Sequence, residues 1–280
     1  MSGMSGMSGM SVESGDSAPV WVLLRGLTRE ARHWGDMPLL LAQQFESMDA
    51  TGQQMVTTLD LPGNGAAASQ TSPCSVRAMV EAARQQLTAT GIKPPYALLA
   101  MSMGGMVATD WAQRYPAEVA RLVLINTSMR PYSHFTERLR PASWARVALL
   151  ALRWRSAQPA EQAIHQLTCN REASRTDDLA TWLEIRKSAP VTAANALRQL
   201  IAAALFRTAP TPPRCPVLVL SSTLDRLVDA QCSAALATAW LAPHYRHPWA
   251  GHDLPHDDAP WVAQRIAGWA QQKPAAPAPQ

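Results

Sequence analysis

Residues 96–105 read YALLAMSMGG. The first half of this stretch is a short apolar run typical of a buried strand, and a helical pattern follows over residues 106–115. Ser102 therefore lies on a tight turn from strand to helix, which exposes its hydroxyl at the carboxyl edge of a sheet. Because the two backbones crowd each other there, small residues are needed, and Ala100 and Gly104 are small.

Apolar runs on both sides of this stretch predict further strands, at residues 20–24, 54–59, 119–125, 216–221 and 244–248. Helical patterns lie between or after them, at residues 34–45, 76–90, 232–240 and 260–271. Strands that alternate with helices at this spacing indicate βαβ units. We therefore expect an α/β fold with a mostly parallel, doubly wound sheet and helices on both faces.

The pattern changes from residue 127 to about residue 213. Runs typical of strands disappear, and prolines divide the segment into helical stretches. It contains 12 arginine and lysine residues and 6 acidic residues, although the whole chain has a net charge of only +4. We therefore expect a helical cap at 127–213, inserted into a core made of residues 19–126 and 214–272.

The overall composition narrows the classes of protein. A hydrophobic fraction of 47% is enough for a sizeable core, and a net charge of +4 without a run of five like charges gives little support for nucleic-acid binding. No apolar run approaches the roughly 18 residues of a membrane span, so stable membrane insertion is not expected. The repetitive start at 1–18 and the proline- and alanine-rich end at 273–280 are predicted to be disordered tails.

Four widely separated cysteines form no CxxC pair, so they predict neither a disulfide framework nor a zinc site. They suit a reducing cytoplasm best. The start of the chain has no basic and apolar signal-peptide pattern.

Two motifs near the end of the chain supply partners for Ser102. A serine hydroxyl needs a base, and in this arrangement the chain order is serine, acid, histidine. Asp225 comes just after a predicted strand, and His252 follows Gly251 after the last predicted strand. We expect Asp225 to orient His252 and His252 to take the proton of Ser102. Asp229 is a second candidate acid, further along the same loop.

The loop after the first strand predicts an oxyanion hole. Gly26 lets this loop bend beside the nucleophile, and the backbone N–H of Leu27 would then pair with that of Met103 at the start of the helix. Both donors would bind the negative oxygen of a tetrahedral intermediate. An ordinary turn at the end of the strand is the alternative interpretation.

Two other segments suggest a metal site or a membrane contact, but a simpler interpretation is favoured for each. Residues 252–258 superficially resemble metal ligands, with His244 and His247 nearby, but Pro255 breaks the helical face that ligands four residues apart need. No metal site is therefore predicted. Residues 144–155 predict a basic cap helix that packs its apolar side on the core and lines the substrate pocket, and contact with a membrane surface is the alternative.

Taken together, these motifs resemble the α/β-hydrolase superfamily over residues 19–271. Residues 60–65 look like the D-x-P-G-x-G turn of its esterase-like and haloperoxidase-like members, and residues 102–105 are similar to their S-M-G-G. Arg25 stands where the family usually has histidine before Gly26. The resemblance implies a helical cap at 127–213 and, without a cofactor, hydrolysis of esters, thioesters, amides or activated C–C bonds.

We therefore expect a serine hydrolase that cleaves a small carboxylic ester through an acyl-enzyme. An acyltransferase, a thioesterase or a C–C bond hydrolase would use the same triad, so these alternatives stay open. A ligand-binding protein without turnover is the alternative from another functional class.

Overall fold

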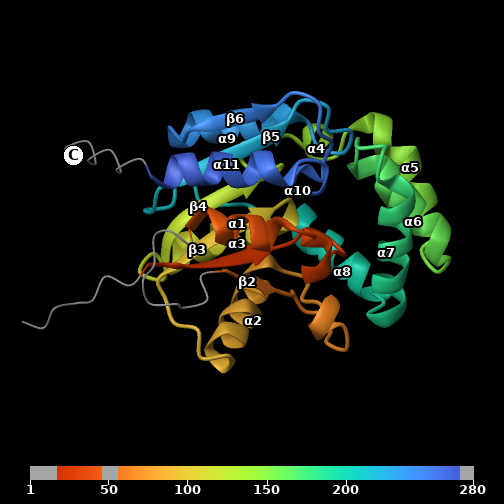
Figure 1. The fold of residues 1–280 in the computed structure, drawn as a ribbon, viewed down its shortest axis with the longest axis horizontal. Helices are drawn as coiled ribbons and strands as arrows, with labels where there is room; N and C mark the ends of the chain where they lie inside the picture. Colours follow the sequence, from red (N-terminus) through yellow and green to blue (C-terminus); the bar gives the residue numbers. More distant parts are fainter. Residues whose placement is uncertain (1–17, 46–55, 272–280) are drawn as a thin grey trace, which may run out of the picture.

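The computed structural model describes residues 18–45 and 56–271 of the chain. Within them, six parallel strands form one sheet in the order β2-β1-β3-β4-β5-β6 (Figure 1). The strands are β1 (Val20–Leu24), β2 (Val56–Leu59), β3 (Tyr96–Met101), β4 (Val119–Ile125), β5 (Val217–Ser222) and β6 (His244–His247). The parallel α/β fold predicted from the sequence is confirmed.

Helices connect these strands and follow the last one. Those of the core are α1 (Met37–Phe45), α2 (Val76–Ala89), α3 (Met103–Arg114), α9 (Ala230–Trp240), α10 (Leu254–Asp257) and α11 (Ala259–Ala270), with short 3-10 helices at Ala31–Trp34 and Gly65–Ala67. The tails predicted at 1–18 and 273–280 lie outside the described residues, apart from residue 18. The first two residues of the strand predicted at 54–59 also lie outside them.

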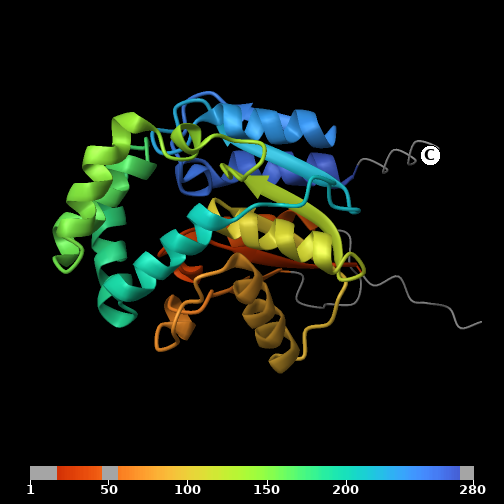
Figure 2. The same ribbon diagram turned by 180° about the vertical axis from the view of Figure 1, so that it is seen from behind.

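The sheet is buried on both faces. Side chains alternate along a strand, so Val22 and Leu24 of β1 join one hydrophobic cluster while Trp21 and Leu23 join the other. Helices α2, α3 and α9 cover the first face, and α1 and α11 cover the second (Figures 1 and 2). Burial on both faces explains why β1 and β3 are continuous apolar runs without polar alternation.

Between β4 and β5 the chain forms a helical segment. Its helices are α4 (Phe135–Arg138), α5 (Pro141–Leu152), α6 (Ala157–Thr168), α7 (Arg175–Ser188) and α8 (Ala193–Leu205). Figures 1 and 2 show α5, α6 and α7 at the side of the sheet toward which the strand arrows point. A small hydrophobic cluster of their own, which includes Ile164, Trp182 and Ile185, packs α6 against α7.

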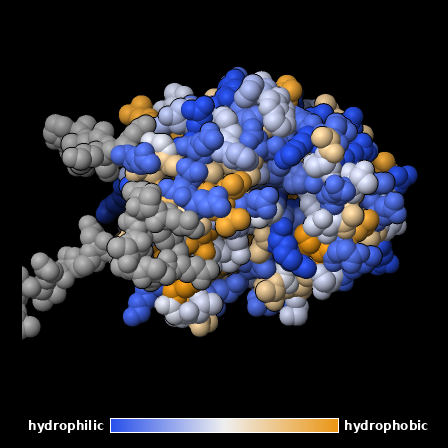
Figure 3. Space-filling model, in the orientation of Figure 1, coloured by the Kyte–Doolittle hydropathy of each residue, from blue (hydrophilic) through white to orange (hydrophobic). Residues whose placement is uncertain are grey.

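Helix α5 differs from the expectation that its apolar side packs on the core. Three of its large apolar residues are exposed, Trp144 at 44%, Leu149 at 45% and Leu152 at 84%. Partly buried Leu150 packs on the cluster of α6 and α7 instead. In the space-filling view, apolar residues lie in separate spots among hydrophilic ones over this side of the molecule (Figure 3). Within the described residues, no helix is both long enough and apolar enough to cross a bilayer.

Candidate active site

Ser102 occupies the turn between β3 and α3. Its backbone has φ 54° and ψ −120°, a conformation that residues other than glycine rarely adopt. This costs about 1–3 kcal/mol and persists only where the surrounding structure enforces it. Two hydrogen bonds do so here: the Ser102 amide donates to the Ile125 carbonyl at 2.9 Å, and the Thr127 hydroxyl donates to the Ser102 carbonyl at 2.8 Å.

Glycines let two backbone segments approach Ser102. A Cβ at Gly104 would lie 2.5 Å from the carbonyl oxygen of Leu24, so the start of α3 packs against the end of β1 only because residue 104 is glycine. A Cβ at Gly26 would lie 3.0 Å from the Cβ of Ser102. The loop after β1 therefore runs directly beside the serine.

His252 joins Ser102 to Asp225. Its Nε2 lies 3.0 Å from the Ser102 hydroxyl, and its Nδ1 lies 2.7 Å from Oδ2 of Asp225. The imidazole and the carboxylate are almost fully buried, at 3% and 2% exposure. The structure thus brings together the three residues singled out in the sequence, in a geometry that suits proton transfer from the hydroxyl to the ring.

Asp225, and not Asp229, is the carboxylate that contacts His252. The second oxygen of the Asp225 carboxylate accepts hydrogen bonds from the amides of Leu227 and Val228, at 2.8 and 2.9 Å. These bonds hold the carboxylate so that its other oxygen faces the histidine. Asp229 instead caps α9, where its carboxylate accepts from the amide of Gln231 at 2.9 Å.

The pKa of His252 is shifted by its surroundings. Burial by itself would lower this pKa, but the charge of Asp225 and its hydrogen bond, helped by the charge of Asp253, raise the pKa above 6.5. The Asp225 contact also leaves Nε2 facing Ser102. The ring is therefore a stronger base than a free imidazole.

The predicted oxyanion donors lie at this site. Met103 is the first residue of α3, and the first amides of a helix have no partner within the helix. Leu27 follows Gly26 in the loop beside Ser102, and its amide has no hydrogen-bond partner among the described residues. Both backbone donors are thus free to bind a ligand oxygen.

Side chains from two other regions hold this loop. The amide of Thr28 donates to the side chain of Gln199 in α8 at 2.8 Å, and the amide of Ala31 donates to Asp60 at 2.7 Å. Asp60 begins the D-x-P-G-x-G turn and also accepts from the amide of Ala66 at 2.8 Å. This turn therefore supports the loop of Leu27.

Arg25 has a role that sequence reasoning missed. Its guanidinium makes two hydrogen bonds to the carboxylate of Asp253, at 3.0 and 2.5 Å, and both residues are almost fully buried. Because Arg25 precedes the loop of Leu27 and Asp253 follows His252, this ion pair ties the two loops together. The sequence signal for this role was the arginine itself, which stands where a histidine is expected. The sequence does not show that Arg25 pairs with Asp253, because the two residues are 228 positions apart.

Sequence reasoning also missed the role of Asn126, which directly follows β4. Its side-chain nitrogen donates to the carbonyl of His252 at 2.8 Å and to the hydroxyl of Ser222 at 3.0 Å, while its side-chain oxygen accepts from the Ser222 amide at 2.9 Å. These bonds connect the end of β5 to the loop of the histidine. A polar residue directly after the apolar end of a strand, residues 122–125, is the signal that points to it.

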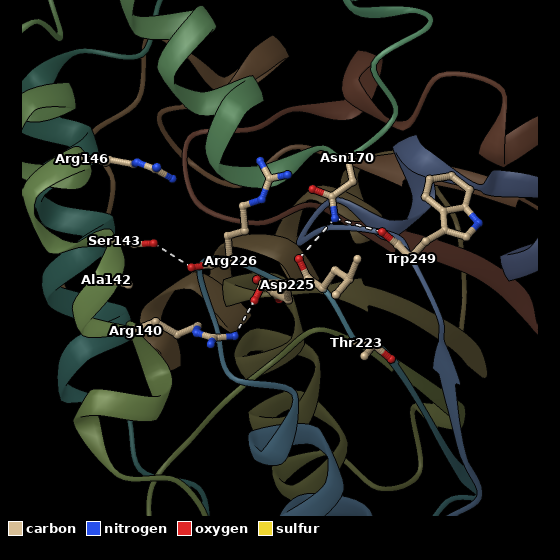
Figure 4. A pocket seen from close by; sticks show the side chains of 10 residues that line it. Arg140, Ala142, Ser143, Arg146, Asn170, Thr223, Asp225, Arg226 and Trp249 are labelled. Carbon is tan, nitrogen blue, oxygen red and sulfur yellow. Dashed lines mark hydrogen bonds between the residues drawn. The ribbon is translucent and has the colours of Figure 1, made fainter.

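An arginine-lined cavity of about 650 Å³ opens beside Asp225 (Figure 4). Arg140 and Arg146 of the helical segment face it, together with Arg226 and Asn170. Arg140 donates to the backbone carbonyl of Asp225 at 2.9 Å. Neither Ser102 nor His252 lines this cavity.

The histidines considered for metal binding in the sequence, His244 and His247, are each hydrogen-bonded to a neighbouring side chain. Within the described part of the chain, atoms suited to metal ligation gather instead at His165, Cys169 and His256.

The family described as alpha/beta hydrolase fold matches residues 22–259. RutD of Escherichia coli, named as a candidate carbamate hydrolase, is 29% identical over 229 residues, which cover 79% of this chain and 76% of RutD.

Two solved structures share the fold. An enol-lactonase from Burkholderia xenovorans has a TM-score of 0.72 at 18% identity and covers 93% of this chain and 94% of its own. A thermophilic esterase from Thermogutta terrifontis has a TM-score of 0.66 at 21% identity, with coverages of 91% and 90%.

Proposed function

This chain belongs to the alpha/beta hydrolase fold family, and we propose that it is a serine hydrolase that cleaves a small carboxylic ester through an acyl-enzyme. The observation that carries the proposal is the pair of hydrogen bonds from Ser102 to His252 and from His252 to Asp225. Hydrolase relatives support the general class of reaction.

In the first step, Oγ of Ser102 attacks the carbonyl carbon of the ester while Nε2 of His252 takes the hydroxyl proton. The carbonyl oxygen becomes negative and is bound by the amides of Leu27 and Met103, each worth about 3 kcal/mol of barrier. The bond to the alkoxy oxygen then breaks, and the imidazolium gives its proton to the departing alcohol. Asp225 stabilises the imidazolium throughout.

In the second step, His252 takes a proton from water, and the resulting hydroxide attacks the acyl carbon. The same two amides bind the second oxyanion. The bond from the carbonyl carbon to Oγ breaks, the imidazolium returns its proton to Ser102, and the carboxylic acid leaves. No cofactor enters this proposed cycle.

We further propose that residues 127–213 form a cap over the site. The hydrogen bond from Thr28 to Gln199 supports this, because it joins the loop of Leu27, called here the oxyanion loop, to α8 of the helical segment. A second contact also supports the cap: Arg140 of the helical segment donates a hydrogen bond to the backbone carbonyl of Asp225. A cytoplasmic location is proposed from the four cysteines, all within the described residues and all free.

Carbamate hydrolysis is a second candidate, favoured by the similarity to RutD. A carbamate has the same carbonyl carbon and develops the same oxyanion, so the residues named above would serve both reactions. The two candidates therefore differ in the leaving and acyl groups that the pocket accepts.

A substrate panel tests the proposal. p-Nitrophenyl acetate and butyrate, a lactone and an aryl carbamate are assayed with the wild type, with Ser102→Ala and with Ser69→Ala as a matched control at an exposed serine. We expect ester turnover to fall at least about 10⁴-fold in Ser102→Ala and to stay unchanged in Ser69→Ala. Equal rates in the wild type and Ser102→Ala would refute the assignment.

A fluorophosphonate probe separates an enzyme from a ligand-binding protein. The probe reacts only with an activated serine, so Ser102 is expected to be the labelled residue in intact-mass and peptide analysis. A chain that stays unlabelled and binds esters without turnover would instead be a binding protein on the hydrolase fold.

A further inference from the structure

Three side chains with metal-binding chemistry meet outside the catalytic site. His165 and Cys169 lie one helical turn apart at the end of α6, and His256 lies on α10. One ligand atom from each of the three comes within 4.8 Å of the other two. The cluster is secluded, because His165 and Cys169 are each only 2% exposed and the His256 side chain is 15% exposed.

Asp178 of α7 lies beside the two histidines, outside the group of three whose ligand atoms gather within 4.8 Å. Its Oδ2 lies 3.2 Å from Nε2 of His165 and 3.0 Å from Nε2 of His256, and it accepts from the Ser174 hydroxyl at 2.8 Å. The contact with His256 falls outside hydrogen-bond geometry, and among the described residues Nε2 of His256 is buried without a hydrogen-bond partner. Nε2 of His256 thus has a close carboxylate neighbour but no well-directed hydrogen bond, and a bound cation would give this buried nitrogen a bond.

The residue types match one metal in particular. Thiolate sulfur, imidazole nitrogen and carboxylate oxygen are the ligands of Zn²⁺, usually four in number and tetrahedral. One thiolate and one carboxylate would balance its charge of +2.

Neighbouring groups hold the imidazoles in place without blocking a cation. The ring of Trp182 lies 5.4 Å from that of His165 and 5.1 Å from that of His256, measured between centroids. The nearby Arg29 guanidinium stacks on Trp182 at 4.2 Å, and its positive charge is paired with Glu161 at 2.7 Å. The charge of Arg29 thus has a counter-ion, which it shares with Arg186 at 2.9 Å.

We propose that His165, Cys169, His256 and Asp178 bind one Zn²⁺ ion. The site joins α6 and α7 of the helical segment to α10, which begins two residues after His252. A metal there would clamp the helical segment onto the loop that carries the histidine. The site does not depend on the hydrolase activity, and the competing interpretation is a metal-free network of two imidazoles around Asp178.

Metal binding is tested on the full chain, purified without a histidine tag and stripped with a chelator. Zn²⁺ is titrated in competition with a chromophoric chelator, and the ratio of bound metal to protein is measured by elemental mass spectrometry. Co²⁺ serves as a spectroscopic probe, because a tetrahedral site with a thiolate ligand gives strong visible bands and a sulfur-to-cobalt charge-transfer band. We expect one equivalent of metal and both spectral features.

Variants identify the ligands. Cys169→Ser is expected to abolish the charge-transfer band, and Cys169→Ser and His256→Gln each to weaken Zn²⁺ binding at least about 100-fold, with a loss of at least about 10-fold for Asp178→Asn. The control variants Cys74→Ser and Cys232→Ser are expected to keep both the band and the affinity. Circular dichroism of the stripped proteins checks that each variant folds.

The metal-free network would be established by either of two results. One is a wild-type protein that takes up no stoichiometric Zn²⁺ against the chelator. The other is a Co²⁺ spectrum without a thiolate band, or a band that survives Cys169→Ser. The wild-type spectrum decides the question even if a variant fails to fold.

Discussion

Replacing Asp253 with asparagine removes one charge from a buried ion pair and leaves the shape of the side chain almost unchanged. The partner side chain of Arg25 is 2% exposed, and its guanidinium also lies 4.9 Å from the ring centroid of Trp34, so it is shielded from water. In the Asp253→Asn variant the arginine charge stays buried without its counter-ion. The variant therefore measures what an uncompensated charge costs at the junction of the oxyanion loop and the histidine loop.

The expected cost follows from the burial of both groups. Removing one partner of a buried ion pair typically lowers the free energy of unfolding by about 3–5 kcal/mol, because the other charge cannot be solvated. A domain of this size has a total stability of about 5–15 kcal/mol, so the loss is a large fraction. At about 2–4 °C per kcal/mol, the melting temperature is expected to fall by about 6–20 °C.

The pH dependence has a definite sign. Burial opposes ionisation of Asp253, but the charge and hydrogen bonds of Arg25 lower its pKa below 3.8. A lowered folded-state pKa contributes stability that is fully present above the unfolded value and is lost as pH falls through the folded value. The difference in stability between the wild type and Asp253→Asn is therefore largest at neutral pH and shrinks below about pH 4.

Urea denaturation at pH 7 of the wild type, Asp253→Asn, Arg25→Met and the double variant gives the coupling energy of the pair. We expect the double variant to be more stable than the sum of the single losses predicts, since it leaves no lone buried charge. Ester turnover is also expected to fall in Asp253→Asn, because the two loops lose their connection. A loss below about 1 kcal/mol with additive single effects would refute this reasoning.

Three further predictions concern the catalytic residues and their support. Asp225→Asn is expected to lower kcat about 10⁴-fold with the fold intact by circular dichroism, and a change below tenfold would exclude Asp225 as the orienting acid. The rate constant kcat/KM is expected to fall as pH decreases through the raised pKa of His252, because the protonated ring cannot accept the Ser102 proton. A pH-rate profile with its acidic midpoint below 6.5 would contradict this. Asn126→Ala is expected to cost about 1–3 kcal/mol in urea denaturation and to lower kcat, since it leaves buried groups of Ser222 and His252 without partners. Unchanged stability together with unchanged kcat would remove Asn126 from the support of the histidine loop.

Local patterns in the sequence determined the fold class and most strand positions. The strands at 20–24 and 119–125 were predicted with the same bounds that they have in the structure. Their bounds depend on short apolar runs and on the turn residues next to them, which can be read from a few neighbouring positions. The helix predicted from residue 106 begins earlier, at Met103, since the turn at Ser102 leads directly into it. Helix boundaries depend on the local backbone geometry, which periodicity alone does not specify.

The sequence also indicated the triad, because the chain order and the strand ends limit which residues can meet at one edge of a parallel sheet. Only the tertiary structure decided that Arg25 pairs with Asp253, that Asn126 holds the histidine loop, and that His256 meets His165. These partners come from loops and helices whose positions are set by packing across the whole sheet. Periodicity is a property of short segments, whereas the approach of residues more than 90 positions apart depends on how every intervening element packs.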